Sequence, residues 1–127
     1  MNQSPTTLPK KVPLSRARRA GPLLFLSGQL PRFPGGGMRE GPIEAQTEQA
    51  IANLRTVLEE HGLGLGDVVK TTVWLTSAEH LEGMNRVYAA SFPEPFPARS
   101  TVVSGLVAPA DIEIEAVAYD PQGSSAR

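Results

Sequence analysis

The chain has 127 residues, the usual size of one domain. Apolar residues make up 40% and charged residues 20% of it, a balance typical of a folded globular protein and not of a disordered one. A net charge of −1 disfavours nucleic acid and anionic membranes as partners. The absence of cysteine excludes disulfides, thiolate metal ligands and a thiol nucleophile.

Metal and membrane binding have little support. The two histidines, His61 and His80, lie in no recognisable ligand motif, so we expect no metal site. No apolar run approaches the roughly 20 residues that span a bilayer, and the N-terminus lacks the apolar segment of a secretory signal. We therefore expect no membrane association and a cytoplasmic location.

The two ends differ in composition from the middle. Residues 1–11 and 121–127 are rich in Pro, Ser, Thr, Gln and Gly, so we expect them to be flexible. Residues 12–120 contain no internal repeat and are expected to form a single domain.

That domain begins with a hairpin signal. Residues 14–19 and 23–27 flank the turn-forming group Ala20-Gly21-Pro22, which predicts two antiparallel strands. Residues 31–41 hold two prolines and four glycines and predict an exposed loop. Their glycine run lacks the Lys-Ser/Thr of a phosphate-binding loop.

Two helices alternate with strands in the middle of the chain. Helical spacing of apolar residues over 44–61, followed by Gly62, predicts an amphipathic helix and its cap. Residues 68–75 alternate as a strand, with Val69, Thr71, Val73 and Leu75 pointing one way and Val68, Lys70, Thr72 and Trp74 the other. The capping-box pair Thr76 and Glu79 predicts a second helix, ending near Phe92.

Prolines 93, 95 and 97 prevent regular structure before two final strands, expected over 100–105 and 111–119. The element order is then ββαβαββ, an α+β fold in which two helices cover one face of a mixed sheet. Alternation in the last strand assigns Glu113, Val117 and Tyr119 to the uncovered face, with Trp74 beside them. A half-apolar face of this kind predicts an oligomer.

Arg99 is the first candidate for chemistry. The stiff segment Phe96-Pro97-Ala98 delivers it to the start of a strand. Its planar guanidinium can bind a carboxylate with two hydrogen bonds and keeps its charge at physiological pH. The alternative is an ordinary surface ion pair.

Glu113 and Glu115 share the uncovered face of the last strand. They are either a solvated strand face or, if that face is buried, carboxylates whose raised pKa suits them to move protons or orient water. Gly28, in Ser27-Gly28-Gln29, would allow a ligand to approach the backbone closely. Asn85 could order a neighbouring loop.

Motifs distributed over nearly the whole chain carry a resemblance. They include Leu24-Phe25-Leu26-Ser27-Gly28-Gln29, Met84-Asn85, Phe96-Pro97-Ala98-Arg99-Ser100 and Ile112-Glu113-Ile114-Glu115-Ala116. The sequence resembles the Rid family, also called YjgF, of enamine and imine deaminases. The resemblance implies a chorismate-mutase-like fold assembled as a homotrimer, with each cleft built by two neighbouring subunits.

The resemblance also implies roles for single residues. Arg99 would hold the substrate carboxylate and Glu113 would position the attacking water, while Ser27, Gly28 and Asn85 would shape the cleft. Well-known members carry a tyrosine at the position of Leu14 and a cysteine at that of Thr101. These two differences are expected either to change the substrate range or rate, or to reduce or abolish the activity.

The implied reaction is hydrolysis of 2-aminoacrylate-type enamines, through 2-imino acids, to 2-keto acids and ammonia without a cofactor. The alternative is a non-enzymatic trimer that binds a small carboxylate metabolite or a partner protein. Ribonuclease activity, attached to relatives, is disfavoured by the acidic charge balance and by the lack of interleaved basic and aromatic residues.

Overall fold

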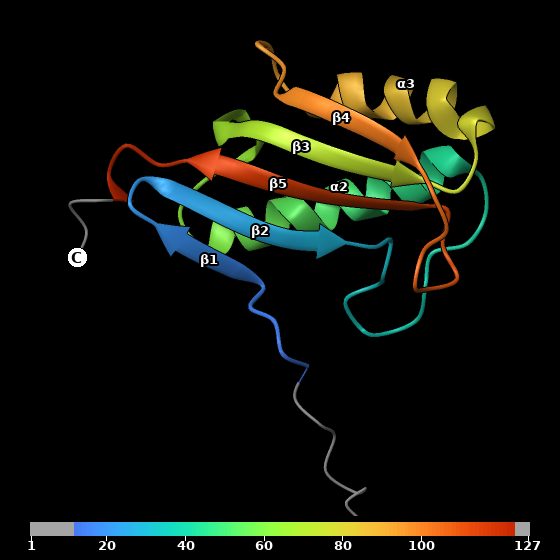
Figure 1. The fold of residues 1–127 in the computed structure, drawn as a ribbon, viewed down its shortest axis with the longest axis horizontal. Helices are drawn as coiled ribbons and strands as arrows, with labels where there is room; N and C mark the ends of the chain where they lie inside the picture. Colours follow the sequence, from blue (N-terminus) through green and yellow to red (C-terminus); the bar gives the residue numbers. More distant parts are fainter. Residues whose placement is uncertain (1–11, 124–127) are drawn as a thin grey trace, which may run out of the picture.

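The structure is a computed structural model that describes residues 12–123. One five-stranded sheet forms its centre, and two α-helices lie behind it in Figure 1. The elements in chain order are β1 (Ala17–Ala20), β2 (Leu23–Gln29), α2 (Ile43–Glu60), the short 3-10 helix η1 (Leu65–Asp67), β3 (Val68–Leu75), the 3-10 helix η2 (Ala78–His80), α3 (Leu81–Ser91), β4 (Ala98–Val103) and β5 (Ile112–Tyr119).

The strands lie in the order β1-β2-β5-β3-β4, as Figure 1 shows from bottom to top. All neighbouring pairs are antiparallel except β3 and β4, which are parallel because α3 carries the chain back between them. The predicted order ββαβαββ and the mixed α+β sheet with both helices on one face are confirmed.

The N-terminal hairpin turns where the sequence predicts. Gly21 has a φ of 60°, the left-handed conformation that glycine adopts without steric cost. β1 pairs with β2 from Ala17 opposite Leu26 to Ala20 opposite Leu23. β2 then pairs with β5, but the register shifts between Leu26 and Gln29, and Ser27 and Gly28 lie in that irregularity.

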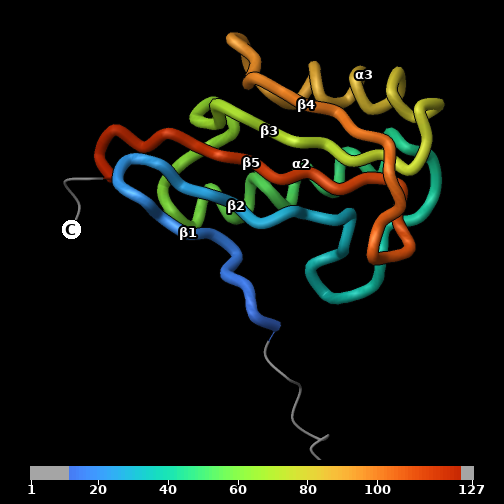
Figure 2. Tube along the Cα trace, viewed as in Figure 1, coloured from blue at the N-terminus to red at the C-terminus, as the bar shows by residue number. Residues whose placement is uncertain are grey.

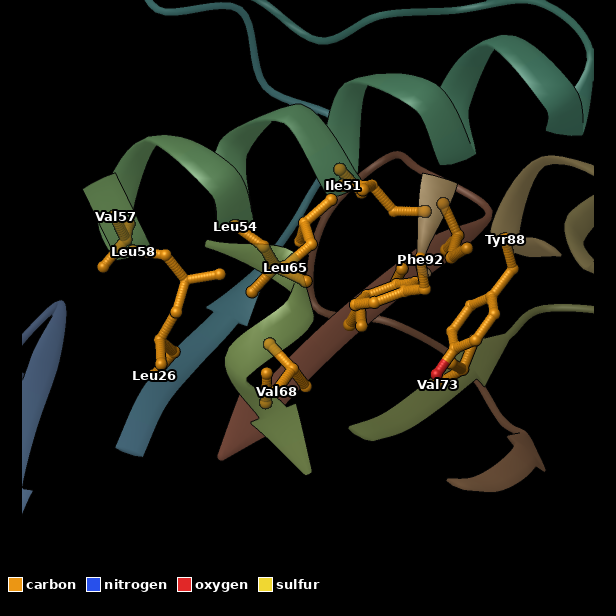
Figure 3. Close-up of a cluster of buried hydrophobic side chains, with 14 of the residues drawn as sticks. Leu26, Ile51, Leu54, Val57, Leu58, Leu65, Val68, Val73, Tyr88 and Phe92 are labelled. Atoms are coloured by element: carbon orange, nitrogen blue, oxygen red, sulfur yellow. The ribbon is translucent and has the colours of Figure 1, made fainter. Parts of the chain in front are cut away.

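The core lies between the sheet and the two helices. Helix α2 buries the predicted apolar stripe Ile51, Leu54, Val57 and Leu58, and Gly62, with a φ of 75°, ends it as expected. Figure 3 shows Leu26 and Leu58 at one end of this cluster and Tyr88 with Phe92 towards the other. The Arg99 guanidinium contacts the ring of Tyr88 at that end of the core.

Two local predictions are wrong. The pairing of β3 with β5 shifts between Val68 and Lys70, so Val68 is buried and Val69 exposed, the reverse of the predicted alternation. The cap of the second helical segment is Ser77, whose hydroxyl accepts a hydrogen bond from the Glu79 amide at 3.1 Å. Thr76 instead donates to Asp111 at 2.7 Å.

Asp111 fixes the start of β5. Its carboxylate accepts hydrogen bonds from Thr76 and, at 3.0 Å, from Gln46 of α2, while its own amide donates to Gln46 Oε1 at 2.8 Å. These hydrogen bonds hold the pKa of Asp111 below its ordinary value, with His80 adding a smaller charge effect. β5 therefore enters the sheet at a fixed point, two residues before Glu113.

The expected flexibility of residues 1–11 and of 124–127 lies outside the described residues. Pro121–Gly123, assigned to the tail from the sequence, continue from β5, and Gly123 is buried where a side chain would overlap Arg19. In the part of the chain that is described, no helix has the length and apolarity needed to cross a bilayer. The cytoplasmic location stays a prediction.

Candidate functional site

The first part of the site is Arg99, the second residue of β4. It pairs with Thr71 of β3, and Thr71 is fully buried beneath the helices. Paired residues on parallel strands point to the same face, so the Arg99 side chain leaves the sheet on its helix-covered face. The proline-rich segment places it at the edge of the core.

Two residues of α3 cradle the guanidinium. Its carbon lies 4.9 Å from the centre of the Tyr88 ring, within cation–π range, and Nη1 lies 3.8 Å from the sulfur of Met84. No carboxylate among residues 12–123 lies within ion-pair distance of it. Arg99 therefore forms no ion pair with the described residues, and because it is exposed, the hydrogen-bonding edge of its guanidinium is available to an external anion.

Tyr88 is itself held in place by contacts with Thr71 and Phe92. Its hydroxyl is 2.7 Å from Thr71 Oγ1, and its ring lies 4.4 Å, centre to centre, from that of Phe92. Burial raises the pKa of Tyr88, against the smaller opposing effects of the Thr71 hydrogen bond and the Arg99 charge. The phenol therefore stays neutral at physiological pH and acts as a support. The sequence did not predict the contact of Tyr88 with Arg99.

A hollow of about 300 Å³ opens beside the guanidinium. Its lining comes from the outer side of α3, from the proline-rich segment and from β4, and consists of Asn85, Tyr88, Ala89, Phe96, Pro97 and Arg99. The predicted pair Arg99 and Asn85 is thus brought together. Ala89 and Phe96, which line the same hollow, were not identified from the sequence.

The second part of the site is Glu113 of β5, on the open face of the sheet. It pairs with Trp74 and lies against Gly28, where an added Cβ would overlap its carboxylate oxygen Oε2. Burial raises the pKa of Glu113, and the neighbouring charge of Glu115 raises it further. Glu115 is exposed. Of the two sequence interpretations, Glu113 fits the buried carboxylate and Glu115 the solvated strand face.

Glu113 and Gly28 line a hollow of about 280 Å³, together with Trp74, Glu115 and the segment Ser104-Gly105-Leu106-Val107. That segment belongs to the connection from β4, which descends across the end of the sheet before it returns into β5 (Figure 2). The only sequence signal for the close contact of Gly28 with Glu113 was a glycine inside a strand.

Ser27, Leu14 and Thr101 line neither of these two hollows. Ser27 lines a third hollow, of about 360 Å³, on the open face, and its hydroxyl donates to the carbonyl of Ser15. Leu14 is 60% exposed, and Thr101 is exposed on β4, two residues after Arg99. A single chain therefore does not bring Arg99, Glu113 and Ser27 into one cleft.

Residues 12–123 contain no group of three or more His, Asp or Glu side chains placed to bind a metal ion. What the chain does supply is an anion-binding guanidinium on one face of a sheet and a partly buried carboxylate on the other. The protein thus belongs to the class of small α+β proteins, and its two candidate charged groups lie on different faces of one sheet: Arg99 on the helix-covered face and Glu113 on the open face.

Comparison with known proteins identifies the family. The model of the family described as Endoribonuclease L-PSP matches residues 5–120, and the chain belongs to this family, which includes the Rid and RutC proteins. A RutC family protein of Pyrococcus horikoshii is 45% identical, over 87% of this chain and 90% of its own. The 2-iminobutanoate/2-iminopropanoate deaminase of Salmonella typhimurium is 39% identical, over 77% and 80%.

A solved structure supports the fold. The crystal structure of RidA from the Antarctic bacterium Psychrobacter superposes with a TM-score of 0.81 at 36% identity, over 87% of this chain and 91% of that one. The resemblance to the Rid family inferred from the sequence is confirmed.

Proposed function

We propose that this protein hydrolyses 2-imino acids, and the enamines that tautomerise to them, to 2-keto acids and ammonia. The observation that carries the proposal is the Arg99 guanidinium, supported by Tyr88 and Met84 and without a carboxylate partner in residues 12–123. Such a group binds a small carboxylate with two hydrogen bonds. The deaminase name of the Salmonella relative is consistent with this substrate class.

The reaction requires positioning and one proton carrier. Water adds to the electrophilic imine carbon, and the carboxylate of Glu113 accepts one proton from the water as the carbon–oxygen bond forms. Glu113 returns that proton to the imine nitrogen, which gives a carbinolamine with one hydroxyl and one amino group. The hydroxyl proton then passes through Glu113 to the amino nitrogen as the carbon–nitrogen bond breaks, so ammonia leaves and the carbon keeps a keto oxygen. Arg99 keeps the substrate carboxylate, and so the imine carbon, at a fixed distance from that water. No cofactor takes part.

The site is completed in an oligomer, which we propose is a homotrimer. Arg99 and Glu113 leave opposite faces of one sheet, so a cleft that contains both must combine two chains. The open face has the exposed apolar residues that such contact would cover, with Phe25 at 44% and Tyr119 at 46% exposure. Sedimentation equilibrium is expected to give three times the 13.5 kDa chain mass; a monomer would contradict the shared cleft.

The activity is tested with imines made in place by an L-amino-acid oxidase, with semicarbazide trapping to follow their decay. Wild-type protein should accelerate the decay, and Arg99→Ala should reduce kcat/KM roughly 10- to 100-fold, the loss expected for hydrogen bonds to a charged group. Arg55→Ala, which removes an exposed arginine of α2, is the matched control and should leave the rate unchanged. Equal rates for wild type and Arg99→Ala would refute the proposal.

Binding without turnover is the principal alternative. Calorimetry with 2-keto acids distinguishes it, because a carboxylate-binding trimer would bind them without accelerating imine decay. The family description also names an endoribonuclease. Incubation with a labelled single-stranded RNA is the third assay, and cleavage that survives Arg99→Ala would assign that activity to another surface.

A further inference from the structure

The hollow beside Arg99 is lined mostly by apolar side chains. Besides the guanidinium, Asn85 is its only polar lining residue among those described, and the other four present apolar surface: Tyr88, Ala89, Phe96 and Pro97. Phe96 is 46% exposed, so its ring is accessible to a ligand in the hollow. Among the described residues of this chain, no acidic side chain lines the hollow, so the chain itself offers no counter-charge to a cationic group placed there.

The size of the hollow exceeds what the smallest substrates need. Its volume is about 300 Å³, whereas one water molecule accounts for about 30 Å³ of liquid. A methyl side chain would fill only a small part of this space. A branched or aromatic side chain would displace water from Ala89 and Phe96 while the adjoining carboxylate stays on Arg99.

We infer that this hollow is the side-chain subsite of the enzyme, that it selects imino acids with uncharged apolar side chains larger than methyl, and that Ala89 sets their size limit. The inference rests on the proposed function for the reaction, but the subsite itself is defined by the lining of the hollow. Each methylene buried there should raise kcat/KM about fourfold.

Ala89 is the position where size can be tested with the least disturbance. It follows Asn85 by four residues, so both lie on the same side of α3. Ala89 is exposed and lines the hollow. Leucine has nearly the helix propensity of alanine, so Ala89→Leu fills the hollow without weakening the helix. Ala90, also exposed in α3 but not part of the lining, provides the matched control Ala90→Leu.

The experiment compares imines generated from L-leucine and from L-alanine with the same oxidase. Wild type and Ala90→Leu should prefer the leucine-derived imine by tenfold or more in kcat/KM. Ala89→Leu should lose at least tenfold on that imine and less than twofold on the alanine-derived one. The retained rate on the small imine shows that the variant is folded. An unchanged preference in Ala89→Leu would overturn the inference.

Binding measurements separate this inference from the proposed reaction. Calorimetry should show tighter binding of 4-methyl-2-oxopentanoate than of pyruvate to wild type, and Ala89→Leu should reduce that difference in affinity at least tenfold. If neither imine is hydrolysed but this difference and its reduction are found, the subsite is upheld and the hydrolytic function fails. If imines are hydrolysed but the two keto acids bind equally, the function is upheld and the subsite fails.

Discussion

The two faces of the sheet hold their charged residues in different ways. On the helix-covered face, Arg99 is supported by an aromatic ring whose hydroxyl is hydrogen bonded inside the core. On the open face, Glu113 lies against the backbone of Gly28 and is only partly covered, beside the exposed Glu115. The position of the Arg99 guanidinium is therefore set by contacts within the chain. The position of the Glu113 carboxylate depends on the space left by the missing side chain of Gly28.

This difference indicates how a site can be divided between copies of a chain. The helix-covered half is complete in the monomer, because support and hollow come from α3, the proline-rich segment and β4. The open half has a carboxylate at an uncovered surface, which a neighbouring chain would cover in the proposed oligomer. The most direct test of this division is to mix two variants, each of which lacks one of the two charged residues.

The largest effect is expected from that mixing. Arg99→Ala and Glu113→Ala should each be nearly inactive as pure proteins. Co-expressed in equal amounts, they should recover about one quarter of wild-type activity, because each shared site draws its two halves from randomly chosen chains. The imine-decay rate of the co-purified mixture is the measurement. No recovery, despite mixed oligomers seen by native mass spectrometry, would mean that one chain supplies both residues.

Substitution of Gly28 tests whether the space beside the Glu113 carboxylate is required on the open face. A Cβ at this position would overlap the Glu113 carboxylate, so Gly28→Ala should displace that group and lower kcat roughly tenfold to 100-fold. KM should change little, since Arg99 lies on the other face. In a Glu113→Ala background the Gly28→Ala substitution should have no further effect on kcat. Additive losses would show that Gly28 acts by another route.

Tyr88 tests the support on the covered face. Tyr88→Leu removes a cation–π contact of about 0.5 to 2 kcal/mol, so KM should rise roughly two- to thirtyfold while kcat is retained. Tyr88→Phe keeps the ring but loses the hydroxyl that orders it, so its KM should rise less than that of Tyr88→Leu. Tyr88→Phe also leaves the Thr71 hydroxyl without its partner, so its free energy of unfolding should fall by about 1 to 2 kcal/mol. Equal KM values for the two variants would contradict the supporting role.

The smallest effect concerns the pH dependence of Glu113. Because its pKa is raised in the folded chain, its ionised form is disfavoured by folding, and stability is lost as pH rises through the folded-state pKa. Glu113→Gln should therefore melt at a higher temperature than wild type at neutral pH, and the difference should vanish below the ordinary value of 4.5. Thermal melts across this pH range test the sign. A Glu113→Gln variant that melts lower at neutral pH would contradict it.

Sequence periodicity was sufficient for the elements and their faces. Alternation along β5 correctly separated the buried isoleucines from Glu113, and Gly62 correctly ended α2. It failed at Val68, because a register shift depends on the partner strand, and at Thr76, whose hydroxyl bonds to a residue 35 positions away. Pairing and tertiary hydrogen bonds are not encoded in local spacing.

The candidate residues could be selected from the sequence by their type, but their grouping in space could not be predicted. Arg99 and Glu113 stood out because each is a charge in an unusual local setting. That they leave opposite faces follows from the pairing of Arg99 with Thr71 and of Glu113 with Trp74, residues three apart on β3, and sequence alone did not determine these registers. The Tyr88 support and the contact of Gly28 with Glu113 are products of packing, and only the helical position of Tyr88 and the glycine itself were visible beforehand.

The hydrogen bond between Thr71 and Tyr88 has a consequence for affinity. A free arginine loses considerable rotational freedom when it binds a ligand, and that loss subtracts from the binding free energy. Here much of the ordering has already occurred during folding, since the ring beneath the guanidinium is locked by a buried hydroxyl pair. Preorganisation of this kind would let a metabolite of only a few atoms be held firmly, and it links substrate affinity to the integrity of the folded core.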